Sequence, residues 1–238
     1  RNDSNPPLDL LTMLLMAKDE DTGEGMSDRQ LRDEAITIYS AGHETSANAL
    51  GWTIYELARH PEIVEKIRAE VDEYLGDKIP TFEDLRNLKY TQQVIEEGMR
   101  LYPPAYAVGR ESIEEDEILG YKIPRKSIIF ISIYAIQRDP NIWENPDEFD
   151  PSRFEPEKVK ARPRLAYLPF GAGPRMCIGN HFAMMEMQLL LAMWCKKFDF
   201  KLDENHPIKM NPLVTLKPKY GIKLKVSNKI KREISQSV

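Results

Sequence analysis

The clearest chemistry in this sequence belongs to a cysteine in a glycine-rich loop. Residues 169–179 read PFGAGPRMCIG and hold Cys177, one of only two cysteines in the chain. The surrounding glycines lose more backbone entropy on folding than other residues would. Arg175 precedes Cys177 by two residues, and an apolar segment typical of a buried helix follows it. A helix N-terminus and a fixed positive charge both favour a thiolate. The loop therefore predicts an ionised sulfur that acts as a nucleophile or as a metal ligand.

The two possible roles of Cys177, nucleophile and metal ligand, require different neighbouring residues. A nucleophilic cysteine needs a base, and His181 follows four residues later, but no oxyanion pattern accompanies the pair. A cysteine hydrolase built on Cys177 and His181 is therefore one alternative, and a buried free cysteine is another. Cys195 stands alone on an apolar helical face, which predicts a buried thiol without chemistry.

Two further patterns have meaning only in combination. The segment AGHETSA, residues 41–47, falls inside a long predicted helix. Gly42 costs about 1 kcal/mol there relative to alanine but lets a ligand approach the backbone. Glu44 and Thr45 place a carboxylic acid beside an alcohol, and such a pair can relay protons into an apolar site. The alternative is that the segment forms a helix–helix contact and that the Glu44 carboxylate is solvated. In EGMR, Glu97 and Arg100 lie on one helical face and predict an ion pair, which is common on surfaces.

Together the three patterns resemble the cytochrome P450 family of haem-thiolate monooxygenases. AGHET fits [AG]-G-x-[DE]-T, EGMR fits E-x-x-R, and both precede the cysteine loop at roughly the family's separations. The resemblance extends over nearly the whole chain. The loop fits the family's cysteine motif, F-x-x-G-x-R-x-C-x-G, at Phe170, Gly173, Arg175, Cys177 and Gly179.

The resemblance implies haem b (iron protoporphyrin IX) as the cofactor. Cys177 would be the axial thiolate ligand of the iron, which promotes O–O cleavage. Gly173 and Gly179 would let the backbone wrap the sulfur beneath the porphyrin. Phe170 resembles the family's aromatic residue over that sulfur.

Several charged residues acquire binding or structural roles from the same resemblance. Arg175 would bind a haem propionate, and Arg110 in AVGR would be another propionate partner. Glu97 and Arg100 resemble the family's internal salt bridge, which Arg153 of PSRF should join. These last three would be needed for folding around haem, with no part in the chemical step.

The remaining motif implies the reaction. Ala41 and Gly42 would form the oxygen-binding groove, and Glu44 and Thr45 would deliver protons during oxygen activation. The expected enzyme inserts one oxygen atom of O2 into a lipophilic substrate, with Ala105–Val108 lining the pocket. A peroxygenase or isomerase of the same fold is the alternative, but such enzymes usually lack the acid–alcohol pair.

The resemblance also carries departures. Gln137 stands where histidine is common, and Ser152 stands where glutamate is usual.

The family's fold is about twice this size, so residues 1–238 are expected to form a single haem-binding unit that resembles its C-terminal half. We expect impaired activity of this chain alone. A truncated, non-catalytic fragment that binds haem poorly or not at all is the alternative.

Partners and location follow from composition and missing motifs. No flavin or nicotinamide fingerprint is present, so electrons should come from a separate ferredoxin, flavodoxin or reductase. The basic stretch Lys158–Arg164, with Lys196 and Lys197, forms a docking face for that donor or is merely scattered surface charge. The net charge of -5 argues against nucleic acid as a partner. No membrane-length apolar run or signal peptide is visible, which predicts a cytoplasmic chain, although an anchor on the missing half stays open.

The elements that must position these residues are mainly α-helices with small β-hairpins. The expected parts are a long central helix capped by Ser27, the E-x-x-R helix, a meander loop, the cysteine loop and a buried helix after it. The pattern predicts two strands within residues 117–136 around a Pro-containing turn, and a hairpin over 212–226. Residues 137–164 read as irregular, and the polar tail from Ser227 is expected to fray.

Overall fold

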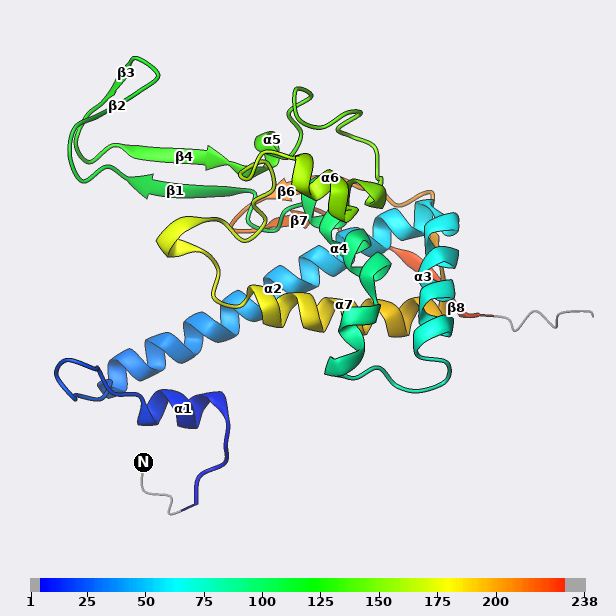
Figure 1. The fold of residues 1–238 in the computed structure, drawn as a ribbon, viewed down its shortest axis with the longest axis horizontal. Coiled ribbons are helices and arrows are strands. Elements are labelled where there is room, and N and C mark those ends of the chain that lie inside the picture. The colour runs from blue at the N-terminus through cyan, green and yellow to red at the C-terminus, as the bar shows by residue number, and fades with distance from the viewer. Residues whose placement is uncertain (1–4, 230–238) are drawn as a thin grey trace, which may run out of the picture. The chain divides into compact units, whose positions relative to one another are not determined.

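The computed structural model describes residues 5–229 and is mainly helical, with small antiparallel sheets (Figure 1). This confirms the predicted fold class. Contacts divide the chain into two compact units, Arg1–Glu44 and Thr45–Val238. One helix, α2 (Asp28–Arg59), runs through the boundary and contributes to both units. None of the helices that the structure describes is long and apolar enough to span a membrane.

The first unit consists of a short helix and the beginning of α2. Helix α1 (Leu10–Met16) begins where the Asp9 side chain accepts a hydrogen bond from the Thr12 N–H at 2.8 Å. The predicted cap of α2 is present. Ser27 Oγ accepts from the Gln30 N–H at 3.3 Å, and Gln30 Oε1 accepts from the Ser27 N–H at 3.1 Å. This reciprocal pair satisfies backbone donors that the first helical turn leaves free.

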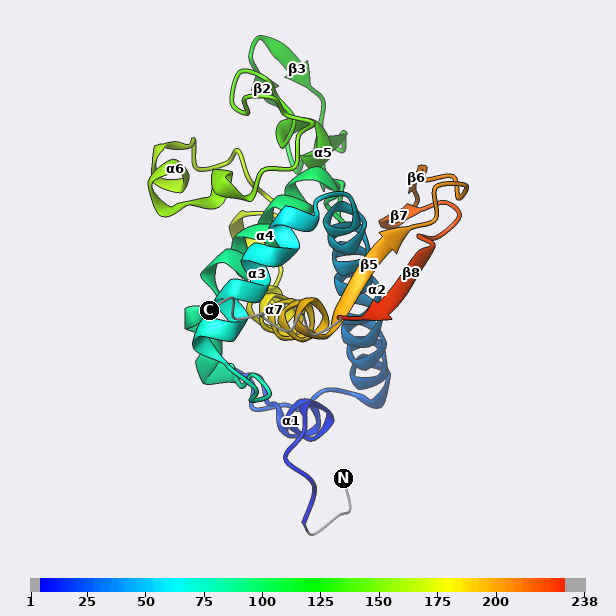
Figure 2. The same ribbon diagram turned by 90° about the vertical axis from the view of Figure 1, so that its right-hand side faces the viewer.

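The core of the second unit lies between helices. Helices α3 (Pro61–Tyr74), α4 (Lys89–Leu101) and α7 (Asn180–Lys197) pack against one another (Figure 2). The proline at the start of α3 and the left-handed Gly76 beyond its end agree with the predicted boundaries. The most deeply buried apolar side chains include Ile67, Leu88, Val94, Ile95 and Leu191.

Specific side chains fix the order of these helices. The Glu70 carboxylate of α3 accepts from the N–H groups of Tyr90 and Thr91 and so caps the start of α4. Gly98 of α4 lies against Thr53 of α2. A Cβ added at Gly98 would lie 3.2 Å from the Thr53 Cβ and closer still to its hydroxyl oxygen. The close approach of these two helices therefore requires glycine.

Within residues 5–229 the strands form four two-stranded antiparallel sheets, and their pairing corrects both strand predictions. Strand β2 (Asp116–Ile118) pairs with β3 (Tyr121–Ile123) across Leu119 and Gly120, both of which have positive φ. The tight turn is therefore at Leu119–Gly120 and not at the proline. Strand β4 (Ile128–Ser132) pairs instead with β1 (Ala107–Glu111), which the sequence analysis missed.

The predicted hairpin over residues 212–226 is also wrong, because its two strands pair with earlier ones. Strand β7 (Leu216–Pro218) pairs with β6 (Met210–Pro212). Strand β8 (Leu224–Asn228) pairs with β5 (Phe198–Leu202), which continues directly from α7 (Figure 2). The β6–β7 pair is local, with three residues between its strands, whereas the β5–β8 pair is non-local and strand propensity does not encode it.

Shorter elements account for the remaining differences. Helix α5 (Ile133–Ile136) replaces the end of the predicted strand, because the Ser132 hydroxyl caps it. The stretch predicted as irregular contains the 3-10 turn η2 (Pro151–Phe154) and helix α6 (Pro156–Ala161). Ser227, expected to fray, lies in β8, and the tail beyond residue 229 lies outside the described residues. Other short turns are η1 (Phe82–Asn87) and η3 (Gly173–Arg175).

Candidate functional site

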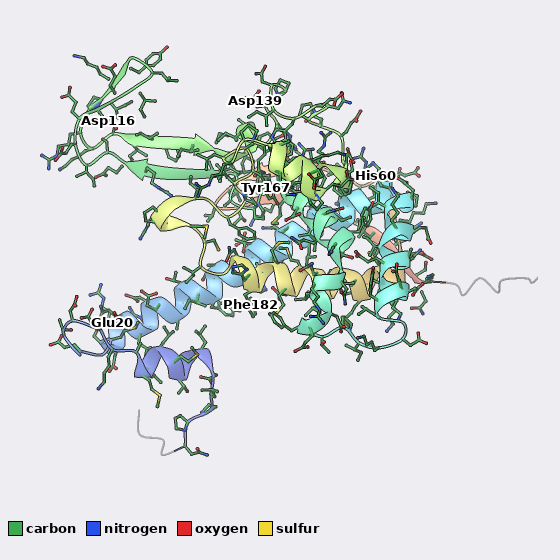
Figure 3. All side chains as sticks on the ribbon, in the orientation of Figure 1. Glu20, His60, Asp116, Asp139, Tyr167 and Phe182 are labelled. Atoms are coloured by element: carbon green, nitrogen blue, oxygen red, sulfur yellow. The ribbon has the colours of Figure 1, made fainter. Side chains whose placement is uncertain are left out.

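The cysteine loop connects two residues labelled in Figure 3, Tyr167 before it and Phe182 in the first turn of α7. Gly171 and Gly173 adopt positive φ values of 72° and 74°, a conformation that other residues rarely reach. The Cys177 N–H donates to the Phe170 carbonyl at 2.9 Å. The loop therefore folds back on itself and holds the cysteine backbone against the residue that the motif places seven positions earlier.

The side chains at the tip of this loop face outward. Residues 172–178 are all exposed, including Arg175 and Cys177. Large apolar side chains accompany them: Ile178 is 94% exposed, Phe182 64% and Met176 49%. A soluble protein rarely leaves such residues together in water unless something covers them. The loop thus presents a thiol, an arginine and an apolar surface on one exposed segment.

Gly179 lies beside the sulfur on its C-terminal side, where a side chain would be in ordinary van der Waals contact with it. A Cβ added at Gly179 would lie 3.9 Å from Cys177 Sγ. Gly179 is the N-cap residue of α7, so the cysteine stands two residues before that cap. The backbone N–H of His181 donates to Asn180 Oδ1 at 2.8 Å. Within residues 5–229 no hydrogen bond joins His181 to Cys177, and the geometry gives no support to a cysteine hydrolase.

Two other predicted cofactor residues occupy different surroundings. Phe170 is half-buried and packs against the core formed with α4 and α7. Arg110 lies in β1, opposite Ile129 of β4, and its exposed guanidinium donates to the Gly109 carbonyl at 2.8 Å. Phe170 is thus fixed by packing, while Arg110 extends from a sheet.

The acid–alcohol motif lies within α2, which is helical through all of it. Ala41, Gly42 and Glu44 are exposed and belong to the first unit, and Thr45 is half-buried at the start of the second. A Cβ added at Gly42 would meet no atom within 4 Å. The helix backbone is therefore open beside this residue, and its role in binding oxygen stays a prediction.

The E-x-x-R pair is fully buried, unlike an ordinary surface pair. Glu97 and Arg100 are both 0% exposed and form two hydrogen bonds, Nε to Oε2 at 2.7 Å and Nη2 to Oε1 at 2.8 Å. Arg153 reaches the same carboxylate, with Nε 3.4 Å from Oε1. The Asp150 N–H donates to Oε1 at 2.9 Å. Burial raises the pKa of Glu97, and these hydrogen bonds and arginine charges oppose that rise by stabilising the carboxylate.

Arg100 also organises the meander loop, the stretch of residues 137–164 that the sequence pattern predicts as irregular. Its guanidinium donates to three backbone carbonyls at 2.6–3.0 Å, in addition to its two bonds to Glu97. A buried guanidinium needs nearly all of its donors satisfied, and here they are. The structure thus brings the three predicted structural residues together around one loop. The carbonyls belong to Gln137, Pro146 and Glu148.

One residue of this network was not predicted from the sequence. Gln137 stands out in the sequence only as a departure from the usual histidine, yet its side chain is fully buried and makes three hydrogen bonds. The signal was available in the sequence, because a polar residue between the apolar run IYAI and RDP needs internal partners if it is buried.

The donor set of the loop fits a haem. Among the residues that the structure describes, no three His, Cys, Asp or Glu side chains gather to hold a metal ion. A metal at Cys177 must therefore bring most of its ligands with it. A porphyrin supplies four nitrogen ligands and needs one axial donor, an apolar contact surface and cations for its propionates. Cys177, the apolar residues beside it and Arg175 provide these three features.

Comparison with known proteins agrees with this geometry. The sequence model of the family described as cytochrome P450 matches residues 1–226. This chain belongs to the cytochrome P450 family. Cytochrome P450 4F2 of Homo sapiens is 40% identical over 224 residues, which are 92% of this chain and 42% of the human protein. A Mus musculus protein named leukotriene-B4 omega-hydroxylase 3 is 41% identical over the same share of each chain.

The fold is that of a P450 as well. The crystal structure of the cytochrome P450DA heme domain matches with a TM-score of 0.86 and 34% sequence identity. The match covers 93% of this chain and 50% of that one. The chain therefore spans about half the length of the P450 relatives it matches and corresponds to the C-terminal portion of the fold.

Proposed function

We propose that this chain supplies the thiolate half of a haem-dependent monooxygenase. The reaction would convert RH, O2, two electrons and two protons into ROH and water. The observation that carries the proposal is the exposed Cys177 thiol in its glycine loop. When bound, haem b would supply dioxygen activation, and the Cys177 thiolate would hold the iron and donate electron density to it. By its resemblance to the family, the chain would act as one haem-binding unit.

The residues of the loop would hold the cofactor. Cys177 would be the iron ligand, with Phe170 packed behind it and Gly173 and Gly179 leaving room for backbone beside the sulfur. Arg175 would pair with a propionate through a charge-assisted hydrogen bond. Arg110 would be a second propionate partner, reaching from β1.

The motif in α2 would handle oxygen and protons. The open backbone at Gly42, with Ala41 before it, would leave space for O2 beside the helix. The Thr45 hydroxyl would pass a proton inward, and the exposed Glu44 carboxylate would replace it from solvent. Glu97, Arg100 and Arg153 would hold the fold around the cofactor without touching the substrate.

Substrate and electron donor are assigned by class. The mouse relative's name states omega-hydroxylation of leukotriene B4, an acyl-chain compound, which supports a lipophilic substrate here. Electrons would come from a separate redox protein, a ferredoxin, flavodoxin or reductase. The exposed Lys158 and Lys160 of α6 suit an acidic donor. Arg162 is less available, because its guanidinium lies 4.1 Å from the centroid of the Trp143 ring.

An isotope experiment tests the reaction. The haem-loaded chain is given a P450 reductase, NADPH and leukotriene B4 under 18O2, and the product is analysed by mass spectrometry. We expect slow turnover to a product that carries one 18O atom, and a lower yield per electron from Thr45→Ala. A product without 18O, or equal yields from Thr45→Ala and the wild type, would contradict the proposed function.

A further inference from the structure

The amide side chain of Gln137 lies between the E-x-x-R helix and the cysteine loop and contacts both. It is 0% exposed, and all of its hydrogen-bonding groups have partners. A buried primary amide is costly unless it is hydrogen-bonded, so this residue occupies a place built around it. Gln137 therefore lies where it can connect the E-x-x-R helix to the cysteine loop.

On one side, Gln137 caps α4. Its Nε2 donates to the carbonyls of Met99 and Arg100, each at 3.0 Å. These carbonyls belong to the last turn of the helix, where backbone acceptors lack helical partners. The backbone carbonyl of Gln137 in turn accepts from Arg100 Nη1 at 3.0 Å. The residue is therefore bonded to the E-x-x-R arginine through both side chain and backbone.

On the other side, Gln137 holds the start of the cysteine loop. Its Oε1 accepts from the Leu168 N–H at 2.9 Å. The Leu168 carbonyl accepts from the Gly171 N–H at 3.0 Å, and the Phe170 carbonyl accepts from the Cys177 N–H at 2.9 Å. Successive short-range hydrogen bonds thus lead from Gln137 to the backbone of the cysteine.

We propose that Gln137 is a positioning residue that fixes the cysteine loop relative to the buried Glu97–Arg100 pair. This rests on the proposed function, in which Cys177 binds haem iron. The exposed tip, residues 172–178, contributes little packing of its own, so its placement depends on anchors at its base. Gln137 is hydrogen-bonded directly to Arg100, so through this anchor the E-x-x-R pair would influence a ligand that it does not touch.

A second anchor provides a matched control. Tyr167 precedes Leu168 by one residue, and its hydroxyl donates a hydrogen bond to the Glu96 carbonyl of α4 at 3.0 Å. Tyr167→Phe removes that bond but leaves the Gln137 bridge intact. Gln92→Met tests the same chemical change as Gln137→Met at an exposed glutamine of α4.

The first readout needs no haem. Amide hydrogen exchange of the full chain should show the wild-type Leu168 N–H protected, although exposed residues follow a few positions later. Gln137→Met should speed exchange at Leu168 by about fivefold or more, the effect of losing one net hydrogen bond. Gln137→His should give a smaller increase, since a neutral imidazole still offers one acceptor and one donor. Tyr167→Phe and Gln92→Met should leave Leu168 protected.

The second readout is the absorption spectrum of the haem-loaded chain, reduced and under carbon monoxide. Gln137→Met should lower the share of the red-shifted, thiolate-ligated Soret band, and Gln137→His should restore part of it. A wild-type chain without that band would overturn the proposed function. The positioning role of Gln137 would then be tested by the hydrogen exchange of the Leu168 N–H alone. A wild type with the band, and a Gln137→Met variant with the same band and the same Leu168 exchange, would overturn the positioning role alone. If Gln137→Met does not fold, an unprotected Leu168 N–H in the wild type would overturn it as well.

Discussion

Replacing Arg100 with methionine should be among the most destabilising single changes in this chain. The substitution removes five hydrogen bonds: two to Glu97 and one each to the carbonyls of Gln137, Pro146 and Glu148. It also strands the fully buried Glu97 carboxylate, with only the Asp150 N–H and the more distant Arg153 to compensate. Breaking a buried ion pair by removing one partner costs about 3–5 kcal/mol.

That magnitude is large against the total stability of a domain, which is about 5–15 kcal/mol. For a chain of this size, it corresponds to a fall in Tm of roughly 6–20 °C. Thermal and urea unfolding of the full chain, followed by far-UV circular dichroism, measures both quantities. The control is Arg86→Met, the same substitution at an exposed arginine of η1, which should change the free energy of unfolding by less than about 0.5 kcal/mol.

The pair can be separated from the carbonyl contacts by a double variant. Glu97→Leu combined with Arg100→Met removes the stranded charge, so it should destabilise less than the sum of the two single changes. Additive effects would mean that the two side chains are not coupled. A loss below about 1 kcal/mol for Arg100→Met would refute the view that this pair holds the meander loop in place.

Three further changes test other parts of the structure. Gly98→Ala should cost about 1–3 kcal/mol in urea unfolding, because its Cβ collides with the α2 threonine it faces, and no loss would mean that the helices can move apart. Hydrogen bonding to Lys78 is the main cause that lowers the pKa of Asp84 to about 2. The stability that the ionised Asp84 adds to the folded chain is therefore present above about pH 4 and is lost as pH falls through about 2. Asp84→Asn should flatten the stability curve in that window, and an unchanged slope would argue against the pair. Iodoacetamide at pH 8 should alkylate the exposed Cys177 and spare Cys195, whose thiol pKa burial raises to about 12, so double labelling of the native chain would contradict the fold.

The sequence was sufficient for features that depend on local chemistry. Ser27 and Gln30 form the predicted capping box, and Pro61 begins α3 as expected. These signals work because the interacting groups lie within one helical turn. The cysteine motif, whose positions are also close in sequence, led to the correct family.

Features that depend on distant partners could not be predicted in this way. Strand β4 pairs with β1 and β8 pairs with β5, while the sequence pattern favoured neighbouring strands. The burial of Arg100 and the bridge through Gln137 likewise depend on a loop that returns to α4 from far along the chain. Spacing indicated that Glu97 and Arg100 could pair, but only the packed structure shows that they do so without water.

Thiolate ligation of haem by Cys177 is the central claim, and one spectrum tests it most directly. The purified chain is mixed with haem, reduced and exposed to carbon monoxide, with Cys177→Ala treated in the same way. We predict a strongly red-shifted Soret band for the wild type and its absence in Cys177→Ala. A wild-type spectrum without that band, or one identical to the spectrum of Cys177→Ala, would contradict the assignment of this loop as the haem-thiolate site.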